Sequence, residues 1–311
     1  MTQRRDLSGG VLIAAETEDA ISAGRPVVAL ESSVLAQGLP VPANREACER
    51  MIHAVVSEGA VPAITAIVRG QPVVGLADSD LERFLRREGV SKVAARDLAA
   101  AATLGMDGAT TVGASLVLAA RAGVEVFATG GIGGVHRDAP FDESADLVEL
   151  SRIPIICVCA GAKAILDLRA TAERLETLSV PVVGFGTDWL PEFYSEGDSI
   201  PVGFRVDSPE QVARIFEQHL ALGMSSAILV ANPPPEGSRL SKEVTGAAVR
   251  SALGELQATG VTGKGVTPAL LAAVDRATGG DSVTTNIALL ESNARLAARI
   301  AVALSSSKKK R

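Results

Sequence analysis

Short apolar runs alternate along the chain with longer stretches in which apolar residues recur every three or four positions. Seven runs have the length of a strand, and most lack polar interruptions, which predicts strands that are buried on both faces. These strands are predicted at Pro26–Leu30, Ala63–Val68, Gln71–Leu76, Val124–Ala128, Pro154–Cys159, Pro181–Phe185 and Ser226–Ala231. The longer stretches predict helices at Asn44–Glu58, Asp78–Arg87, Leu98–Leu104, Ser115–Ala122, Ala162–Thr177, Pro209–Leu222, Lys242–Gln257, Pro268–Thr278 and Asn286–Leu304. Because strands and helices alternate, we expect a three-layer α/β/α fold with a largely parallel or mixed central sheet.

The chain of 311 residues reads as a single domain with short additions. We expect an N-terminal extension at residues 1–20, the α/β/α domain at 21–304 and a flexible basic tail, SSSKKKR, at 305–311. The region Asp188–Pro201 has no periodicity and is rich in Gly, Ser and acidic residues. We expect it to be a surface loop or lid and not a domain boundary.

Composition and charge narrow the functional classes. Aromatic residues make up only 3% of the chain, so the core must be built from aliphatic side chains. A net charge of -6 argues against a surface that wraps nucleic acid. The N-terminus has no apolar signal segment, and no apolar run is long enough to span a bilayer. The three cysteines form no CxxC pair, which favours a reducing compartment, so we expect a cytoplasmic protein without a membrane contact.

The stretch TGGIGGVHRDAPFDESADL, at Thr129–Leu147, follows a predicted buried strand and carries four glycines within five positions. Such a loop suits positive φ angles, close approach of a ligand and an anion-binding nest of amides, although a plain structural turn is the alternative. Ligands of open α/β sheets bind beyond the carboxyl ends of strands, which is where this loop lies. His136, Asp142, Ser144 and Asp146 follow in the same stretch. Their carboxylates favour a hard cation such as Mg²⁺ or Mn²⁺, whereas a helix N-cap is the simpler role for Asp142.

Lys163, in CVCAGAK, follows a buried strand and a turn of small residues. We expect it to open a helix, where apolar neighbours and the positive helix end would favour its free amine. A free amine is a nucleophile that forms Schiff bases with sugar carbons, and a surface lysine with a solvated head is the alternative.

Two further charged residues complete the candidate site. Glu31 ends the strand PVVAL and suits a general acid with a raised pKa, or else a carboxylate paired in an ion pair. Lys92, in SKVAARDL, suits a phosphate ligand as a point charge.

Eight blocks occur in the order that is typical of pseudouridine-5′-phosphate glycosidases, and the chain resembles that family from about residue 27 to residue 304. The blocks are ALESSVLAQGLP (Ala29–Pro40), SKVAARDL (Ser91–Leu98), GATTVGAS (Gly108–Ser115), FATGGIGGVHR (Phe127–Arg137), FDESADL (Phe141–Leu147), CAGAKAILDL (Cys159–Leu168), VANPPPE (Val230–Glu236) and TGGDSVTTNIALL (Thr278–Leu290).

The resemblance implies an enzyme of pseudouridine catabolism. It would reversibly cleave the C–C glycosidic bond of pseudouridine 5′-phosphate to uracil and ribose 5-phosphate, with one Mn²⁺ per subunit in a homotrimer. By position in the matching blocks, Lys163 is the nucleophile, Glu31 the proton donor and Asp142 the metal ligand. The implied substrate contacts are Lys92, Val112, Thr129, His136, Ser144, Ala145, Asp146 and Asn286.

The chain departs from the family pattern at two places. The loop between His136 and Phe141 reads RDAP and is shorter than expected, and Glu143 replaces an apolar residue. Two other functions fit the same residues. One is a Schiff-base lyase or aldolase for another sugar phosphate, and the other is a sugar-phosphate sensor without catalysis.

Overall fold

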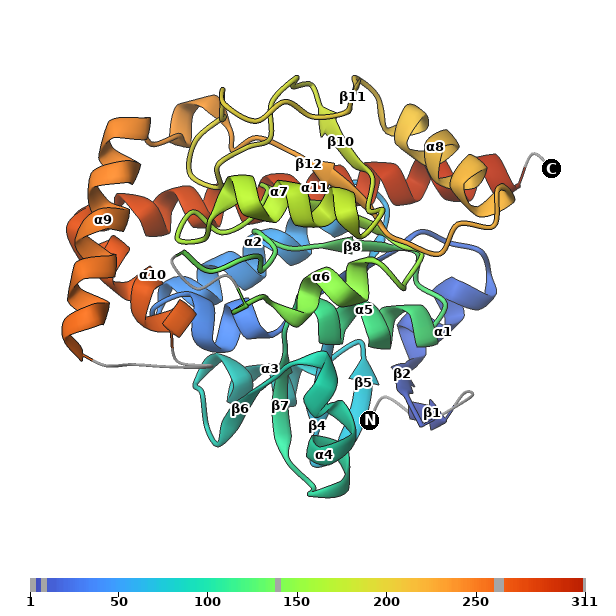
Figure 1. Cartoon of the computed structure of the whole chain (residues 1–311). Coiled ribbons are helices and arrows are strands. Elements are labelled where there is room, and N and C mark those ends of the chain that lie inside the picture. The colour runs from blue at the N-terminus through green and yellow to red at the C-terminus, as the bar shows by residue number, and fades with distance from the viewer. Residues whose placement is uncertain (1–3, 7–9, 138–140, 260–265, 310–311) are drawn as a thin grey trace.

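The computed structural model describes residues 4–6, 10–137, 141–259 and 266–309. They form one α/β domain whose mixed, largely parallel sheet is flanked by helices (Figure 1), as predicted. The strands are β1 (Arg4–Asp6), β2 (Leu12–Ala14), β3 (Val27–Leu30), β4 (Val61–Val68), β5 (Gln71–Val74), β6 (Val90–Val93), β7 (Asp107–Thr110), β8 (Val126–Ala128), β9 (Ile156–Cys159), β10 (Val182–Phe185), β11 (Phe204–Val206) and β12 (Ile228–Ala231). The α-helices are α1 (Ala15–Ser22), α2 (Ala43–Ser57), α3 (Asp78–Leu85), α4 (Leu98–Thr103), α5 (Val112–Arg121), α6 (Ala145–Leu150), α7 (Leu168–Thr177), α8 (Pro209–Ala221), α9 (Lys242–Thr259), α10 (Val266–Ala277) and α11 (Asp281–Lys308).

The strand order places β3, β8 and β9 side by side. Along the main path the order is β1-β2-β5-β4-β3-β8-β9-β12-β10-β11, and β7 branches from β4 to carry β6. From β4 through β3, β8, β9, β12 and β10 to β11 every pairing is parallel. The carboxyl ends of β3, β8 and β9 therefore lie at one edge of the sheet, where open α/β sheets bind ligands.

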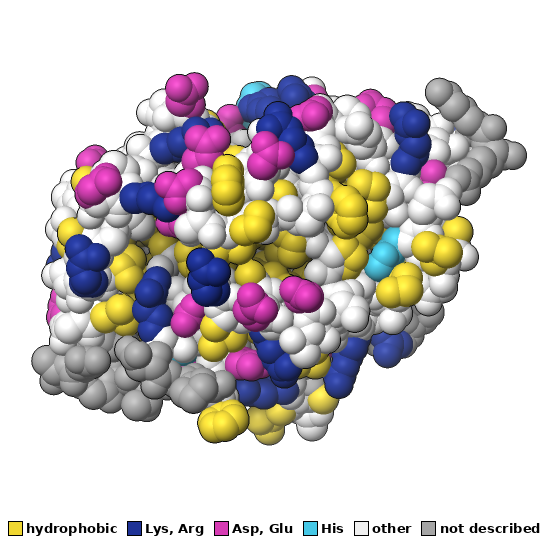
Figure 2. Space-filling view, turned by 45° about the horizontal axis from the view of Figure 1, so that its top comes forward, with side chains coloured by type: hydrophobic (Ala, Val, Ile, Leu, Met, Phe, Trp, Pro, Cys, Tyr) yellow, Lys and Arg dark blue, Asp and Glu magenta, His cyan; other side chains and the backbone are white. Residues whose placement is uncertain are grey.

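The core is aliphatic, as the scarcity of aromatic residues predicts. Every residue of β3, β8, β9 and β12 is buried. Helices α5, α6 and α7 lie in front of the sheet in Figure 1, and α2 and α11 lie behind it. On the face shown in Figure 2, basic and acidic side chains are interspersed around apolar patches.

All seven predicted strands are confirmed, and no end is shifted by more than two residues. The helix that follows Asp207 is also confirmed, and its start is encoded locally. The Ser208 side chain caps α8 by accepting a hydrogen bond from the main-chain amide of Gln211, and the main-chain amide of Ser208 donates to the side-chain oxygen of Gln211. Pro209 occupies the first helical position.

The predicted helix at Ala162–Thr177 begins six residues late. Ala162 forms a β-bridge with Ile132, and the chain turns until Asp167 caps α7 by accepting from the Ala170 amide. Lys163 therefore does not open a helix, and the argument that a helix dipole favours its free amine is wrong.

The ends of the chain are more ordered than predicted. Part of the expected extension belongs to the fold, because β2 pairs with β5 and α1 follows it directly. Helix α11 continues through the first four residues of the expected tail, to Lys308. The hydroxyl of Ser305 donates to the carbonyl of Gly24, and Lys308 pairs with Glu125, so contacts to the domain hold this helical turn.

The segment Asp188–Pro201 contains no named helix or strand, as predicted for a surface loop, but its middle is packed into the protein. Phe193 and Tyr194 are buried and pack edge to face, with ring centroids 4.7 Å apart. The Phe193 amide donates to the carbonyl of Ala160, next to β9. Among the helices of the described residues, none combines the length and the apolar character that crossing a membrane requires.

Candidate active site

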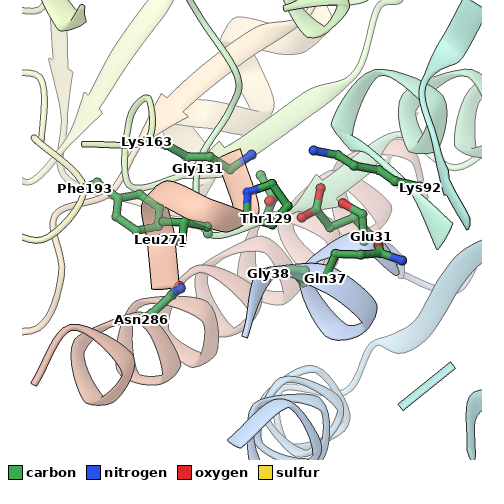
Figure 3. A pocket seen from close by; sticks show the side chains of 14 residues that line it. Glu31, Gln37, Gly38, Lys92, Thr129, Gly131, Lys163, Phe193, Leu271 and Asn286 are labelled. Atoms are coloured by element: carbon green, nitrogen blue, oxygen red, sulfur yellow. The ribbon is translucent and has the colours of Figure 1, made fainter. Parts of the chain in front are cut away.

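A cleft lies at the edge of the sheet where β3, β8 and β9 end. Three predicted functional groups, Glu31, Lys163 and Lys92, line it together (Figure 3). The full lining is Glu31, Ser33, Val34, Gln37, Gly38, Lys92, Thr129, Gly130, Gly131, Lys163, Phe193, Pro268, Leu271 and Asn286. Five of the residues implied as catalytic groups or substrate contacts line this cleft, namely Glu31, Lys92, Thr129, Lys163 and Asn286, and their roles stay predictions.

Glu31 directly follows β3 and is only 2% exposed. Burial raises the pKa of its carboxyl from 4.5 to about 7, and the charge of Asp146 adds to the rise, while Lys163 and Lys92 oppose it. Oxygen Oε2 has no hydrogen-bond partner among the described residues. A carboxyl with this pKa is substantially protonated at neutral pH, so it is suited to donate a proton.

Two lysines reach the cleft from different elements. Lys163 stands two residues beyond Gly161, whose φ of 83° turns the chain after β9, and its amide donates to the carbonyl of Ile132. Lys92 lies on β6. Figure 3 shows both amino groups pointing into the space beside Thr129 and Glu31. The cleft therefore brings two lysine side chains together with a buried carboxyl.

The glycine-rich loop after β8 is built for close packing. The prediction of positive φ angles in this loop is wrong, because none of its four glycines has a positive φ. These glycines are Gly130, Gly131, Gly133 and Gly134. A Cβ at Gly131 would lie 2.6 Å from the Phe193 ring, and one at Gly133 would lie 2.2 Å from the Ser144 hydroxyl. The glycines are needed because other parts of the protein press against this loop.

The predicted anion nest is occupied by a carboxylate of the protein itself. Asp146 is 4% exposed, and its two oxygens accept from the amides of Gly133 (2.9 Å) and Gly113 (2.8 Å). It therefore joins the glycine-rich loop to the first turn of α5. Ser144 and Asp146 match substrate contacts of the family, but neither lines the cleft, and Asp146 has a clear structural role here.

The remaining implied contacts lie outside the lining of the cleft. Val112 is completely buried at the start of α5, and Ala145 is half-buried at the start of α6. His136 is half-buried, and its amide donates to the carbonyl of Asp142 (3.0 Å). Residues 138–140 of the short RDAP loop lie outside the described residues, so the effect predicted for that loop stays a prediction.

The expected metal ligand does not sit in a ligand cluster. Asp142 is exposed, and it is not the N-cap of α6, because Ser144 takes that role by accepting from the Asp146 amide. Within the part of the chain that the structure describes, no group of three or more His, Cys, Asp or Glu side chains is placed to hold a metal ion. The side chains of the described residues therefore do not by themselves provide a complete set of ligands for Mn²⁺.

Two residues that line the cleft, the polar Gln37 and the aromatic Phe193, were not predicted from the sequence. Gln37 comes from a single π-helical turn, Val34–Gly38, and Phe193 comes from the loop that was predicted to be a lid. Gln37 had a usable signal, since it stands six residues after Glu31 in the same matching block. Glu143, the unexpected acid in FDESAD, is not part of the lining of the cleft and pairs with Arg174 of α7 at 2.8 Å.

Comparison with known proteins is consistent with this arrangement. Residues 16–303 match the family model described as Indigoidine synthase A like protein. The chain is similar to a pseudouridine-5′-phosphate glycosidase of Gemmatimonas aurantiaca, with 60% identity over 92% of this chain and 94% of the relative. It is also similar to one of Herpetosiphon aurantiacus, with 47% identity over 94% of this chain and 98% of the relative.

Two solved structures share the fold over 98% of this chain and 100% of their own. One is the prealnumycin C-glycosynthase in complex with ribulose 5-phosphate, with a TM-score of 0.90 and 38% identity. The other is an indigoidine synthase A-like protein from Thermotoga maritima, with a TM-score of 0.88 and 35% identity. From the family match over most of its length and these full-length likenesses, the chain belongs to the indigoidine synthase A-like family.

Proposed function

We propose that the protein is an enzyme that cleaves the C–C glycosidic bond of pseudouridine 5′-phosphate to uracil and ribose 5-phosphate. The observation that carries the proposal is the convergence of Lys163, Lys92 and the buried carboxyl of Glu31 on one cleft. The names of its relatives, pseudouridine-5′-phosphate glycosidases at up to 60% identity, support the same reaction.

The chemistry of a C-glycoside explains why an amine is needed. Direct departure of the base would leave a carbanion, which simple acid–base hydrolysis with two carboxylates does not readily stabilise. In the proposed route the Lys163 amine bonds to C1′, the ring C1′–O4′ bond breaks, and the proton lost from nitrogen balances the proton gained by O4′. The nitrogen lone pair then forms a C=N bond to C1′ as the bond from C1′ to C5 of uracil breaks.

Glu31 supplies the proton that turns the departing C5 into a C–H group of uracil. A pKa of about 7 keeps much of this carboxyl protonated at neutral pH, and positioned acid catalysis contributes about 10²–10⁴-fold. Water then hydrolyses the imine, which frees Lys163 and releases ribose 5-phosphate. Lys92, across the cleft, is the proposed partner of the phosphate as a compact point charge.

The family resemblance implies Mn²⁺. We propose that this ion, bound by Asp142 and water without further described ligands, assists the site, and that the steps proposed for Lys163 and Glu31 do not involve it. A homotrimer and a cytoplasmic location are likewise proposed and are open to sedimentation and fractionation measurements.

Release of uracil tests the proposed function. Purified protein is incubated with pseudouridine 5′-phosphate, and uracil and ribose 5-phosphate are measured by chromatography. We expect equal amounts of both from the wild type, none from Lys163→Ala, and wild-type activity from the exposed control Lys309→Ala. Absence of uracil from well-folded wild type contradicts the proposal.

A second candidate is a Schiff-base reaction on another sugar phosphate, and the ribulose 5-phosphate held by the related C-glycosynthase favours including it. Parallel incubations with ribulose 5-phosphate, followed by analysis of new products, separate the two candidates. Turnover of ribulose 5-phosphate without cleavage of pseudouridine 5′-phosphate would favour the second.

A further inference from the structure

Four buried oxygen atoms of residues that line the cleft have no hydrogen-bond partner among the described residues. They are Glu31 Oε2, Gln37 Oε1, Thr129 Oγ1 and Asn286 Oδ1. Buried polar atoms are nearly always paired in native proteins, so unpaired ones in a cleft indicate positions that a ligand completes. Glu31 already has a role in the proposed reaction, whereas Gln37 has none.

The amide of Gln37 is held in one orientation. Its Nε2 donates to the main-chain carbonyl of Val90 on β6 (3.3 Å). Because only the amide nitrogen can donate to a carbonyl, the oxygen is the atom left for a ligand. Gln37 belongs to the π-helical turn Val34–Gly38, and π-helical turns are frequent at functional sites. Figure 3 shows Gln37 on the same side of the cleft as Glu31, with Asn286 on another wall.

The rest of this part of the cleft is apolar. Val34, Phe193, Pro268 and Leu271 line it together with the two amides. Apolar walls with a few polar atoms are typical of sites that hold a flat heterocyclic ring. In the proposed function Lys163 attacks the sugar and Lys92 binds the phosphate, so the base of the substrate is the part that fits between these walls.

A carbonyl-type acceptor can distinguish a C-glycoside from an N-glycoside. When both nucleotides are placed with the glycosidic bond at the same point, their rings have the same outline and two equivalent carbonyl positions. The difference lies at one ring atom: pseudouridine presents N1–H where uridine presents C5–H. An acceptor that faces this position gains a hydrogen bond from pseudouridine and is left unpaired by uridine.

We propose, on the basis of the proposed function, that Gln37 is a specificity-determining residue whose Oε1 accepts the N1–H of the pseudouridine base. The hydrogen bond to Val90 fixes the acceptor before substrate arrives, so the site selects the C-linked isomer without rearranging. Asn286 then faces another part of the ring edge.

Kinetics with a methylated substrate test this assignment. The ratio of kcat/KM for pseudouridine 5′-phosphate to that for its N1-methyl derivative is measured for wild type, Gln37→Met and the exposed control Gln218→Met. We expect wild type and the control to prefer the parent substrate by about 10- to 100-fold, because methylation removes the donor and leaves a buried acceptor unpaired. In Gln37→Met, which has no acceptor, we expect the ratio to fall below about threefold.

Two further readouts separate the possible failures. Covalent trapping of ribose 5-phosphate on Gln37→Met should match wild type, because the sugar subsite is unchanged. If Gln37→Met does not fold, Gln37→Glu retains an acceptor and must retain the discrimination. An unchanged ratio in Gln37→Met, or equal use of both substrates by wild type, overturns the assignment while leaving the proposed function intact. Failure of wild type to cleave the parent substrate overturns both.

Discussion

Glu31→Gln replaces a buried carboxyl with a neutral amide of nearly the same shape, and this change should make the protein more stable at alkaline pH. Between pH 4.5 and about 7 the folded protein holds a proton on Glu31 that the unfolded chain has released. The stability that this group contributes is therefore complete below pH 4.5, falls as the pH rises, and is lost above about 7. Glutamine has no proton to lose, so it removes this dependence.

The size of the effect follows from the two pKa values. The pKa of Glu31 is about 2.5 higher in the folded protein, at about 7, than in the unfolded chain, at 4.5. At about 1.36 kcal/mol per pKa unit, this difference corresponds to about 3 kcal/mol in the free energy of unfolding. Urea unfolding of wild type and Glu31→Gln, at one protein concentration and at several pH values from 5 to 8, measures it. The free energy of unfolding of the variant relative to wild type should rise by about 2–3 kcal/mol across this range.

A matched control isolates the buried position. Glu236→Gln makes the same chemical change at an exposed site and serves as the control for the loss of one carboxyl group. Glu31→Gln should also lose uracil release while keeping the covalent sugar adduct, because it lacks only the proton donor. A flat pH dependence for Glu31→Gln refutes the reasoning that burial raises the pKa of this carboxyl.

Three further predictions concern the loop and the metal. Gly133→Ala should destabilise the fold by about 1–3 kcal/mol, because its Cβ would lie 2.2 Å from the Ser144 hydroxyl, whereas Gly237→Ala has open space; urea unfolding compares the two. Asp146→Asn should cost about 1–3 kcal/mol in the same assay, because one of two buried amides loses its acceptor; wild-type stability would contradict the joining role. Excess chelator should suppress uracil release and Mn²⁺ should restore it, with Asp142→Ala needing more Mn²⁺; full activity in chelator rejects the metal proposal.

The central sheet could be predicted because its strands are continuous apolar runs. Burial on both faces leaves a strong signal, as in Ile228–Ala231, where every residue is buried. Five short strands of the described residues were overlooked, among them two that carry polar residues: Val90–Val93 contains Ser and Lys, and Asp107–Thr110 begins with Asp. These two strands pair with each other, and pairing between distant segments leaves little trace in local composition.

The site could be predicted as a set of residues but not as an arrangement. Glu31 and Lys163 follow strands β3 and β9, on either side of β8, so their meeting follows from the parallel sheet. The role of Asp146 does not, because a glycine-rich sequence shows that an anion can bind but not that the anion comes from the same chain. The matching block that contains Glu31 also contains Gln37, but the unpaired oxygen that distinguishes Gln37 exists only in the folded protein.

The central claim is that the amine of Lys163 forms a covalent bond to the sugar, and reductive trapping tests it most directly. Wild-type protein is incubated with ribose 5-phosphate and borohydride, digested, and analysed by peptide mass spectrometry. The account predicts that the reduced sugar phosphate is attached to Lys163 as a secondary amine and that Lys163→Ala is not labelled. Labelling of another lysine with Lys163 unmodified, or no label on enzyme that releases uracil, would contradict it.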